Sequence, residues 1–254
     1  MRLRKTLAMT APPSLVHVTR DGIRFLADEK AHETGLIVAF TNREGGSSAA
    51  PYDSLNLAAR VGDDPDAVAA NRNKVAAAAG FDVSRIALAR QVHQTDLIEV
   101  DRKHAGVLGE ADGLIVREPG PVAAILTADC APVVVAGDHA IGVLHAGWRG
   151  LVAGVIEAGL EVLEGANRAW IGPCIHACCY EVGPKVVDSF LAQGLPVADP
   201  THVDPAQAAA AILKREGVVD VAVATDCTHC GDSYFSFRRD GVTGRQGAFA
   251  GLIE

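Results

Sequence analysis

The pattern of the sequence predicts one domain of the mixed α/β class, and three observations lead to this prediction. Short apolar runs of strand character follow one another through residues 86–144, and segments typical of helices lie on either side of them. Consecutive strands with separate helices differ from a strict βαβ alternation, so the sheet should be mixed. No linker, repeat or low-complexity block divides the 254 residues, a length that one core can still support.

The clearest single element is a helix over residues 67–79. Asp64 can cap its first turn, Pro65 suits the first helical position, and Gly80 is the kind of residue that ends a helix. Further helices are predicted over 150–163, 184–192 and 205–216, and strands over 35–41, 86–92, 96–100, 113–116, 122–127, 133–136, 140–144, 169–171 and 218–224.

Composition limits the classes of function. The net charge is −8 and no basic block is present, so a nucleic acid is not an expected partner. No apolar run approaches the ~20 residues of a membrane span, and the basic start lacks the apolar stretch of a signal peptide. We therefore expect a cytoplasmic protein whose six cysteines are thiols or metal ligands. Residues 1–20 are predicted to be a flexible tail before a single domain over residues 21–254.

Three potential metal ligands stand where a predicted strand gives way to a loop, namely His93, Cys130 and His145. Strand ends suit functional residues because a rigid element aims the side chain into a cleft. Two imidazoles and one thiolate form a set that zinc favours, and three ligands leave one position open for chemistry. Their intervals match no compact zinc motif, however, and a lone histidine or cysteine is often structural. Spacing alone therefore leaves both interpretations open.

Several longer motifs resemble one known family. They are TADCAPV at 127–133, HAGWRG at 145–150, IGPCI at 171–175, CCYEVG at 178–183 and FSFRRDGVTGRQ at 235–246. Over residues 35–254 the sequence resembles the laccase-domain proteins, once described as multicopper polyphenol oxidases and now as zinc-dependent purine nucleoside phosphorylases. The bacterial peptidoglycan editing factor is a member of this family.

This resemblance implies a layered α/β sandwich with one zinc ion on His93, Cys130 and His145, which would form the catalytic centre. It also implies phosphorolysis of adenosine, inosine, guanosine and methylthioadenosine, and deamination of adenosine. Small-molecule nucleosides and phosphate are then the expected partners. Two alternatives stay open. The same triad would serve an amidase that edits serine-containing muropeptide precursors, whereas a fourth protein ligand such as Cys174 would indicate a non-catalytic zinc or partner-binding domain.

Phosphate binding needs fixed cationic donors, and arginine supplies a bidentate fork. By resemblance Arg72, on the helix that begins near Pro65, is the leading candidate, and Arg43 in a glycine-rich loop is the second. Arg149 precedes a predicted helix, where backbone amides attract anions. It can equally anchor the loop that holds His145.

The remaining cysteines are expected to be structural. Cys174, Cys178 and Cys179 are predicted to pack around a Gly-Pro turn. Cys227 and Cys230 form the one CxxC pair, but the sequence offers no second pair for it. We therefore expect neither a metal-binding nor a redox function for this pair.

A multicopper oxidase is excluded by the histidine pattern. Such enzymes use several His-x-His pairs, and none of the nine histidines forms one. Imidazole and thiolate also bind copper, which ranks above zinc in intrinsic affinity. Adventitious copper with weak oxidase activity is therefore compatible with a zinc enzyme.

Overall fold

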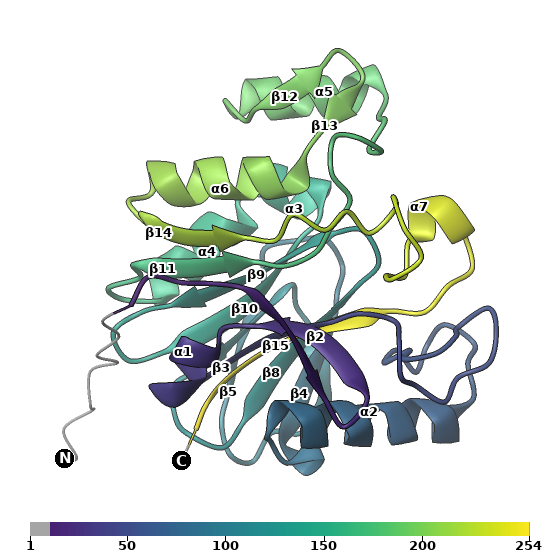
Figure 1. Ribbon diagram of the computed structural model, residues 1–254. Coiled ribbons are helices and arrows are strands. Elements are labelled where there is room, and N and C mark those ends of the chain that lie inside the picture. The colour runs from purple at the N-terminus through teal and green to yellow at the C-terminus, as the bar shows by residue number, and fades with distance from the viewer. Residues whose placement is uncertain (1–10, 254) are drawn as a thin grey trace.

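The computed structural model describes residues 11–253 and places them in two stacked β-sheets with helices on both outer faces (Figure 1). Within this range one sheet has the order β1 (Val16–Arg20), β2 (Ile23–Ala27), β3 (Leu36–Thr41), β15 (Gln246–Leu252), β8 (Val122–Thr127), β4 (Ile86–Arg90) and β6 (Gly106–Glu110). The other has the order β14 (Asp220–Val223), β11 (Arg168–Ile171), β9 (Ala131–Ala136), β10 (Ile141–Ala146), β7 (Gly113–Val116) and β5 (Leu97–Val100). Both sheets mix parallel and antiparallel neighbours, which confirms the predicted mixed α/β class.

Helices complete four layers in the order α, β, β, α. The outer face of the second sheet is covered by α3 (Trp148–Ala153), α4 (Val155–Val162) and α6 (Pro205–Arg215), and α5 (Pro184–Ala192) packs beside them. The first sheet packs against α2 (Pro65–Ala79). Smaller elements are α1 (Glu29–Glu33), a 3-10 turn (Val83–Arg85), the hairpin β12 (Val197–Asp199) and β13 (His202–Val203), and α7 (Phe237–Asp240). None of the described helices combines the length and apolar composition that a membrane span requires.

The strands are apolar along both faces because each sheet is covered on both sides. On β9, Val133 and Val135 pack against the helices, while Val134 packs between the two sheets with Trp170 of β11. Covered sheets produce nearly continuous apolar runs rather than alternating ones. This explains why short apolar runs predicted most strands of the interior, although β15 was not predicted as a strand.

The predicted helix after Asp64 is confirmed. The Asp64 side chain accepts a hydrogen bond from the backbone N–H of Asp66, and Pro65 occupies the first turn of α2. Gly80 ends the helix with a φ of 79°, in the left-handed region that glycine adopts without steric cost.

The single helix predicted over residues 150–163 is wrong. The chain forms α3 and α4 in its place, separated at Gly154, whose φ is 95°. Gly154 ends α3 by donating its N–H to the carbonyl oxygens of Gly150 and Leu151. The apolar periodicity continues across the break, so the sequence pattern did not reveal it.

The flexible tail predicted over residues 1–20 is wrong for its last part. Residues 16–20 form β1, which pairs with β2 in an antiparallel hairpin. The hairpin turns at Asp21 and Gly22, whose φ values are 50° and 77°. An Asp-Gly pair between alternating segments is a strong hairpin signal, because both turn residues need positive φ. Residues 1–10 of the predicted tail lie outside the described residues.

We expect Gly154→Ala to lower the free energy of unfolding by about 1–2 kcal/mol, since a Cβ atom makes the left-handed conformation unfavourable. Urea unfolding measures this change. Gly183→Ala is a matched control, because Gly183 precedes a helix with negative φ and a Cβ atom there meets nothing within 4 Å. Equal losses in the two variants would show that the helix break does not depend on the Gly154 conformation.

Candidate metal centre

The candidate metal centre lies at the end of the sandwich where two of its three side chains stand on connections between the sheets. His93 follows β4 of the first sheet on the way to β5 of the second, and Cys130 lies in the short connection from β8 to β9. His145 stands near the end of β10, just before α3. Three segments that are far apart in sequence therefore deliver one ligand each to the same end of the sandwich, as the strand-end positions predicted.

The three side chains form a group with the dimensions of a single-ion site. One donor atom from each of His93, Cys130 and His145 lies within 4.8 Å of the other two. The Cys130 Sγ atom is 3.9 Å from Nε2 of His93, and the two imidazole rings meet edge to face. Zinc binds nitrogen and sulfur at about 2.0–2.3 Å, so its ligands stand less than about 4.6 Å apart. The residues present therefore fit a zinc ion.

The buried carboxylate of Asp112 holds two of these ligands in place. Its Oδ1 atom is 2.7 Å from Nδ1 of His145, which leaves Nε2 of that ring for a metal. The carboxylate also accepts hydrogen bonds from the backbone N–H groups of Val92, His93 and Gln94. A carboxylate behind a ligating histidine fixes the ring's tautomer and orientation. Asp112 was not predicted as a functional residue, because an acidic residue between two strands carries no motif.

Neighbouring charges shift the pKa values of the ligands. Burial alone would raise the pKa of the Cys130 thiol, but the charge of His145 and hydrogen bonds from both imidazoles lower it to about 6. Burial alone would lower the pKa of His145, but the Cys130 sulfur and the Asp112 hydrogen bond raise it to about 9. The site thus favours thiolate, the form of cysteine that binds metals. A metal ion would replace the proton on His145.

Asp129 anchors the backbone that carries Cys130. The φ of Asp129 is 91°, an uncommon value for a residue with a side chain. Its carboxylate accepts from the Thr228 hydroxyl and from the backbone N–H of Arg238, each at 2.7 Å. Its carbonyl oxygen accepts from the N–H of Ile175. These contacts hold the unfavourable conformation and thereby the direction of the Cys130 side chain.

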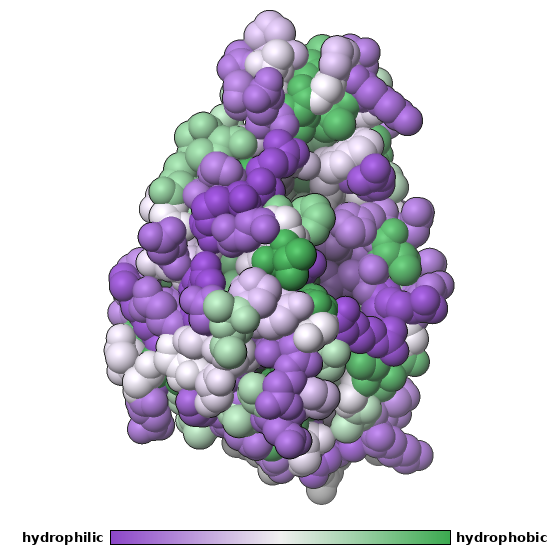
Figure 2. Space-filling view, turned by 90° about the vertical axis from the view of Figure 1, so that its right-hand side faces the viewer, coloured by the Kyte–Doolittle hydropathy of each residue, from purple (hydrophilic) through white to green (hydrophobic). Residues whose placement is uncertain are grey.

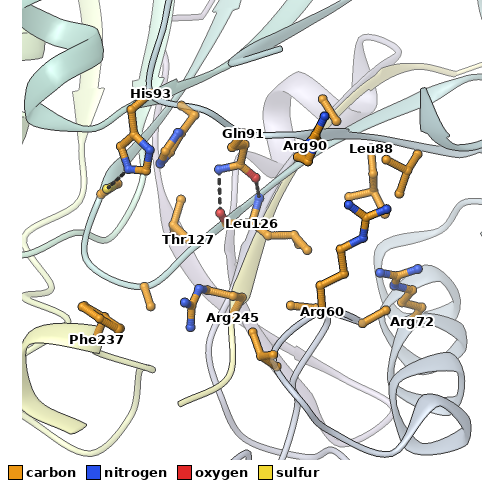
Figure 3. A pocket seen from close by; sticks show the side chains of 18 residues that line it. Arg60, Arg72, Leu88, Arg90, Gln91, His93, Leu126, Thr127, Phe237 and Arg245 are labelled. Atoms are coloured by element: carbon orange, nitrogen blue, oxygen red, sulfur yellow. Dashed lines mark hydrogen bonds between the residues drawn. The ribbon is translucent and has the colours of Figure 1, made fainter. Parts of the chain in front are cut away.

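A cavity of about 550 Å³ opens beside the triad (Figure 3). It is lined by all three ligands and by Ala58, Ala59, Arg60, Val61, Arg72, Leu88, Ala89, Arg90, Gln91, Val107, Leu126, Thr127, Ala128, Phe237 and Arg245. The Gln91 side chain forms two hydrogen bonds with the backbone of Leu126, which extend the β4–β8 pairing into the cavity wall. The end of the molecule that carries α7 faces the viewer in Figure 2, and a few apolar side chains gather near its middle among hydrophilic ones.

Three arginines that line the cavity, Arg60, Arg72 and Arg245, form no direct ion pair with an acidic side chain among the described residues. Arg72 donates from Nε and Nη2 to the carbonyl oxygen of Leu57, and Arg245 donates to the carbonyl oxygens of Thr243 and Gly244. Burial lowers the pKa of both guanidinium groups. Half-buried cations whose side-chain hydrogen bonds go only to carbonyl oxygens, as those of Arg72 and Arg245 do among the described residues, are suited to bind an anion. Arg245 was not predicted, although it lies in the C-terminal motif.

The other two predicted phosphate-binding arginines do not line this cavity. Arg43 donates to the carbonyl oxygen of Asp53, forms ion pairs with the carboxylates of Asp53 and Asp240, and stacks on Phe235. These contacts give it a structural role. Arg149 is exposed, with its guanidinium 4.3 Å from the ring of Trp148. The sequence placed both near loops of the site but could not show which way their side chains point.

The expectation that the CxxC pair is isolated is wrong. The sulfur atoms of Cys227 and Cys230 lie within 4.8 Å of those of Cys178 and Cys179, so the four thiols form a second group. The predicted packing role fits only Cys174, which is buried.

Cys174 is not part of the group formed by the triad. No other His, Cys, Asp or Glu side chain among residues 11–253 belongs to the triad group. One coordination position of a zinc ion there would therefore be open.

Fold and site together define a class, an αββα sandwich with a three-ligand metal site opening into a cavity. Comparison with known proteins specifies the family. The model of the family described as multi-copper polyphenol oxidoreductase laccase matches residues 37–253. The chain belongs to this family, which confirms the resemblance found in its motifs.

The relatives share both sequence and fold with this chain. A protein of Streptomyces coelicolor named purine nucleoside phosphorylase is 39% identical over 234 residues, covering 86% of this chain and 96% of the relative. A protein of that name from Deinococcus radiodurans is 41% identical over 230 residues, covering 84% of this chain and 88% of the relative. The crystal structure of YlmD from Geobacillus stearothermophilus has a TM-score of 0.85 at 31% identity, covering 95% of this chain and 100% of that one.

We expect Asp112→Asn to weaken zinc binding by the triad about 10–100-fold, because the amide cannot accept all of the hydrogen bonds that orient His93 and His145. Competition with a chromophoric chelator measures the dissociation constant. Asp28→Asn is the matched control, since the Asp28 carboxylate is also buried and accepts from Ala31, Ser14 and the Trp170 indole far from the triad. Unchanged affinity in Asp112→Asn would contradict the orienting role.

Proposed function

We propose that this protein is a zinc-dependent purine nucleoside phosphorylase that also deaminates adenosine. The observation that carries the proposal is the cavity, which has a three-ligand metal site at one end and arginines without acidic partners along its wall. A volume of about 550 Å³ falls within the usual range for sites that hold a small molecule. The names of the relatives, at 39% and 41% identity, support the same substrate class.

The arrangement of the cavity would let one bound nucleoside undergo both reactions, phosphorolysis at the ribose and deamination at the base. In Figure 3 His93 of the triad lies at one end, Arg60 and Arg72 lie at the other, and Arg245 lies between them. A purine base with its six-membered ring toward the triad would direct its ribose toward the arginines. Phosphate held by Arg72 and Arg245 would then lie on the sugar side, where phosphorolysis needs it.

The chain's own residues supply positioning and charge. In phosphorolysis a phosphate oxygen forms a bond with C1′ of the ribose as the bond from C1′ to the base nitrogen breaks. The base leaves with the electron pair of the broken bond and takes up a proton from water. Arg72 and Arg245 would hold the phosphate dianion in a half-buried site, where the reduced dielectric strengthens charged hydrogen bonds. The exposed ring of Phe237 offers an apolar surface for the base. A zinc ion on the triad, when bound, supplies Lewis acidity at its open position.

We also propose a cytoplasmic location with small-molecule partners and no nucleic-acid partner. All six cysteines are free, which suits a reducing compartment. Copper would bind the same imidazole and thiolate donors, and we regard it as an adventitious metal.

We expect zinc-loaded protein to phosphorolyse adenosine and inosine with a kcat/KM far above its kcat/KM for hydrolysis of a serine-linked muropeptide precursor. Cys130→Ala should abolish turnover, because the triad loses its thiolate. The control is Cys174→Ala, which removes a buried thiol outside the triad and should remain active. A higher kcat/KM for the muropeptide would overturn the phosphorylase assignment in favour of the amidase.

We expect Arg72→Ala to raise the KM for phosphate about 10–150-fold, which corresponds to the loss of one charged hydrogen bond of about 1.5–3 kcal/mol. Deamination of adenosine needs no phosphate and serves as the internal control. Arg72→Lys keeps the charge without the planar fork and should give an intermediate KM. If both activities of Arg72→Ala fell equally, the arginine would act by holding the Leu57 carbonyl and not by binding phosphate.

A further inference from the structure

A second cluster of metal-ligand side chains lies outside the cavity. The sulfur atoms of Cys178, Cys179, Cys227 and Cys230 all lie within 4.8 Å of one another. The Cys230 sulfur is 3.3 Å from that of Cys178 and 3.2 Å from that of Cys179. We propose that these four cysteines bind a second zinc ion, as a closed structural site distinct from the triad.

The fold itself brings the two cysteine pairs together. Strands β11 and β14 are parallel neighbours, so the loops that follow them leave the sheet side by side. Cys178 and Cys179 lie in a turn after β11, and Cys227 and Cys230 lie in the loop after β14. The backbone N–H of Thr228 donates to the carbonyl oxygen of Cys174, which continues the pairing beyond the strand ends. Cys179 and Cys230 therefore meet although they are 51 residues apart.

The donor set favours one tetrahedral ion. Four thiolates at about 2.3 Å from a zinc ion complete its coordination without leaving a position for water, which is the pattern of structural sites. An iron–sulfur cluster would need wider spacing, because its thiolates bind different iron atoms. All four residues are free cysteines, so no disulfide competes for the sulfurs in this structure.

A backbone amide already points at one of the sulfurs. The backbone N–H of His176 donates to Sγ of Cys227 at 3.4 Å. Hydrogen bonds of this kind stabilise the negative charge of a metal-bound thiolate and fix its direction. The loop that follows β11 thus contributes a hydrogen bond to a sulfur of the loop that follows β14.

The proposed ion would support the triad indirectly. Thr228 lies next to Cys227, and its hydroxyl donates to Asp129, the residue before the triad ligand Cys130. Arg239 fastens the same loop by donating to the carbonyl oxygens of Thr228, His229 and Gly231. Locking the loop would hold Asp129 in its left-handed conformation. The four cysteines are therefore positioning residues for Cys130, and the proposal does not depend on which substrate the cavity binds.

The deciding experiment counts metal in protein purified under reducing conditions. Elemental analysis should find two zinc ions per wild-type chain, one in Cys130→Ala, and one in Cys227→Ser/Cys230→Ser. His229→Ala is the matched control, since it changes the same turn but removes no thiol, and it should keep two. Cobalt(II) loaded into Cys130→Ala should show thiolate-to-metal charge transfer stronger than cobalt at the triad, because four thiolates contribute in place of one.

Two results would overturn the proposal. One is a wild-type chain with a single zinc ion that Cys130→Ala removes. The other is intact-mass analysis after alkylation in anaerobic, non-reducing buffer that shows two of the six thiols joined as a disulfide. If the double serine variant does not fold, the zinc content of the wild type and the cobalt spectrum of Cys130→Ala still decide. A faster loss of triad zinc to a chelator in Cys178→Ser, with His229→Ala unchanged, would support the positioning role.

Discussion

The architecture of the metal centre depends on one buried carboxylate, that of Asp112. A charge without solvent is costly unless hydrogen bonds surround it. Three consecutive backbone N–H groups and the imidazole of His145 provide those bonds, and they lower the pKa of Asp112 to about 2 despite burial. The loop that carries His93 and the ring of His145 are thereby fixed relative to each other. The hydrogen bonds that satisfy the Asp112 carboxylate are therefore the same ones that orient the two histidines.

The second constraint is the stacking of two covered sheets. Two connections, from β4 to β5 and from β8 to β9, pass from one sheet to the other at the end of the sandwich. Short crossings leave little freedom, and both contain a non-glycine residue with positive φ, His93 at 61° and Asp129 at 91°. Such conformations persist only where surrounding contacts enforce them. Two of the three candidate ligands, His93 and Cys130, therefore lie where the chain changes sheet, and the third, His145, lies near the end of β10.

The sequence predicted features that depend on local chemistry. The caps of α2 at Asp64 and Gly80 act within one turn, so they were found. Most buried strands show as apolar runs and were also found, whereas the buried strands β2 and β15 were not predicted. The triad was detectable because each ligand ends a strand, although only the family resemblance distinguished it from structural residues. Asp112 and the meeting of Cys179 with Cys230 depend on strand order, since parallel neighbours and sheet crossings join segments that are distant in sequence. No local pattern encodes that order. For the same reason the sequence did not predict the directions in which the Arg43 and Arg245 side chains point.

The chain as a whole is acidic, whereas the wall of its cavity carries arginines. A net charge of −8 repels anions at long range, but salt screens that effect beyond about 10 Å. Apart from the triad, the charged side chains that line the cavity are all guanidinium groups. Arg90 is neutralised by Glu110 at the surface. Arg72 and Arg245 are half-buried, and among the described residues their side chains donate hydrogen bonds only to carbonyl oxygens. Their desolvation has already occurred in the folded protein, so a phosphate that reaches them would gain hydrogen bonds at little further cost in ordering. An acidic protein can in this way hold an anion site that its overall composition does not reveal.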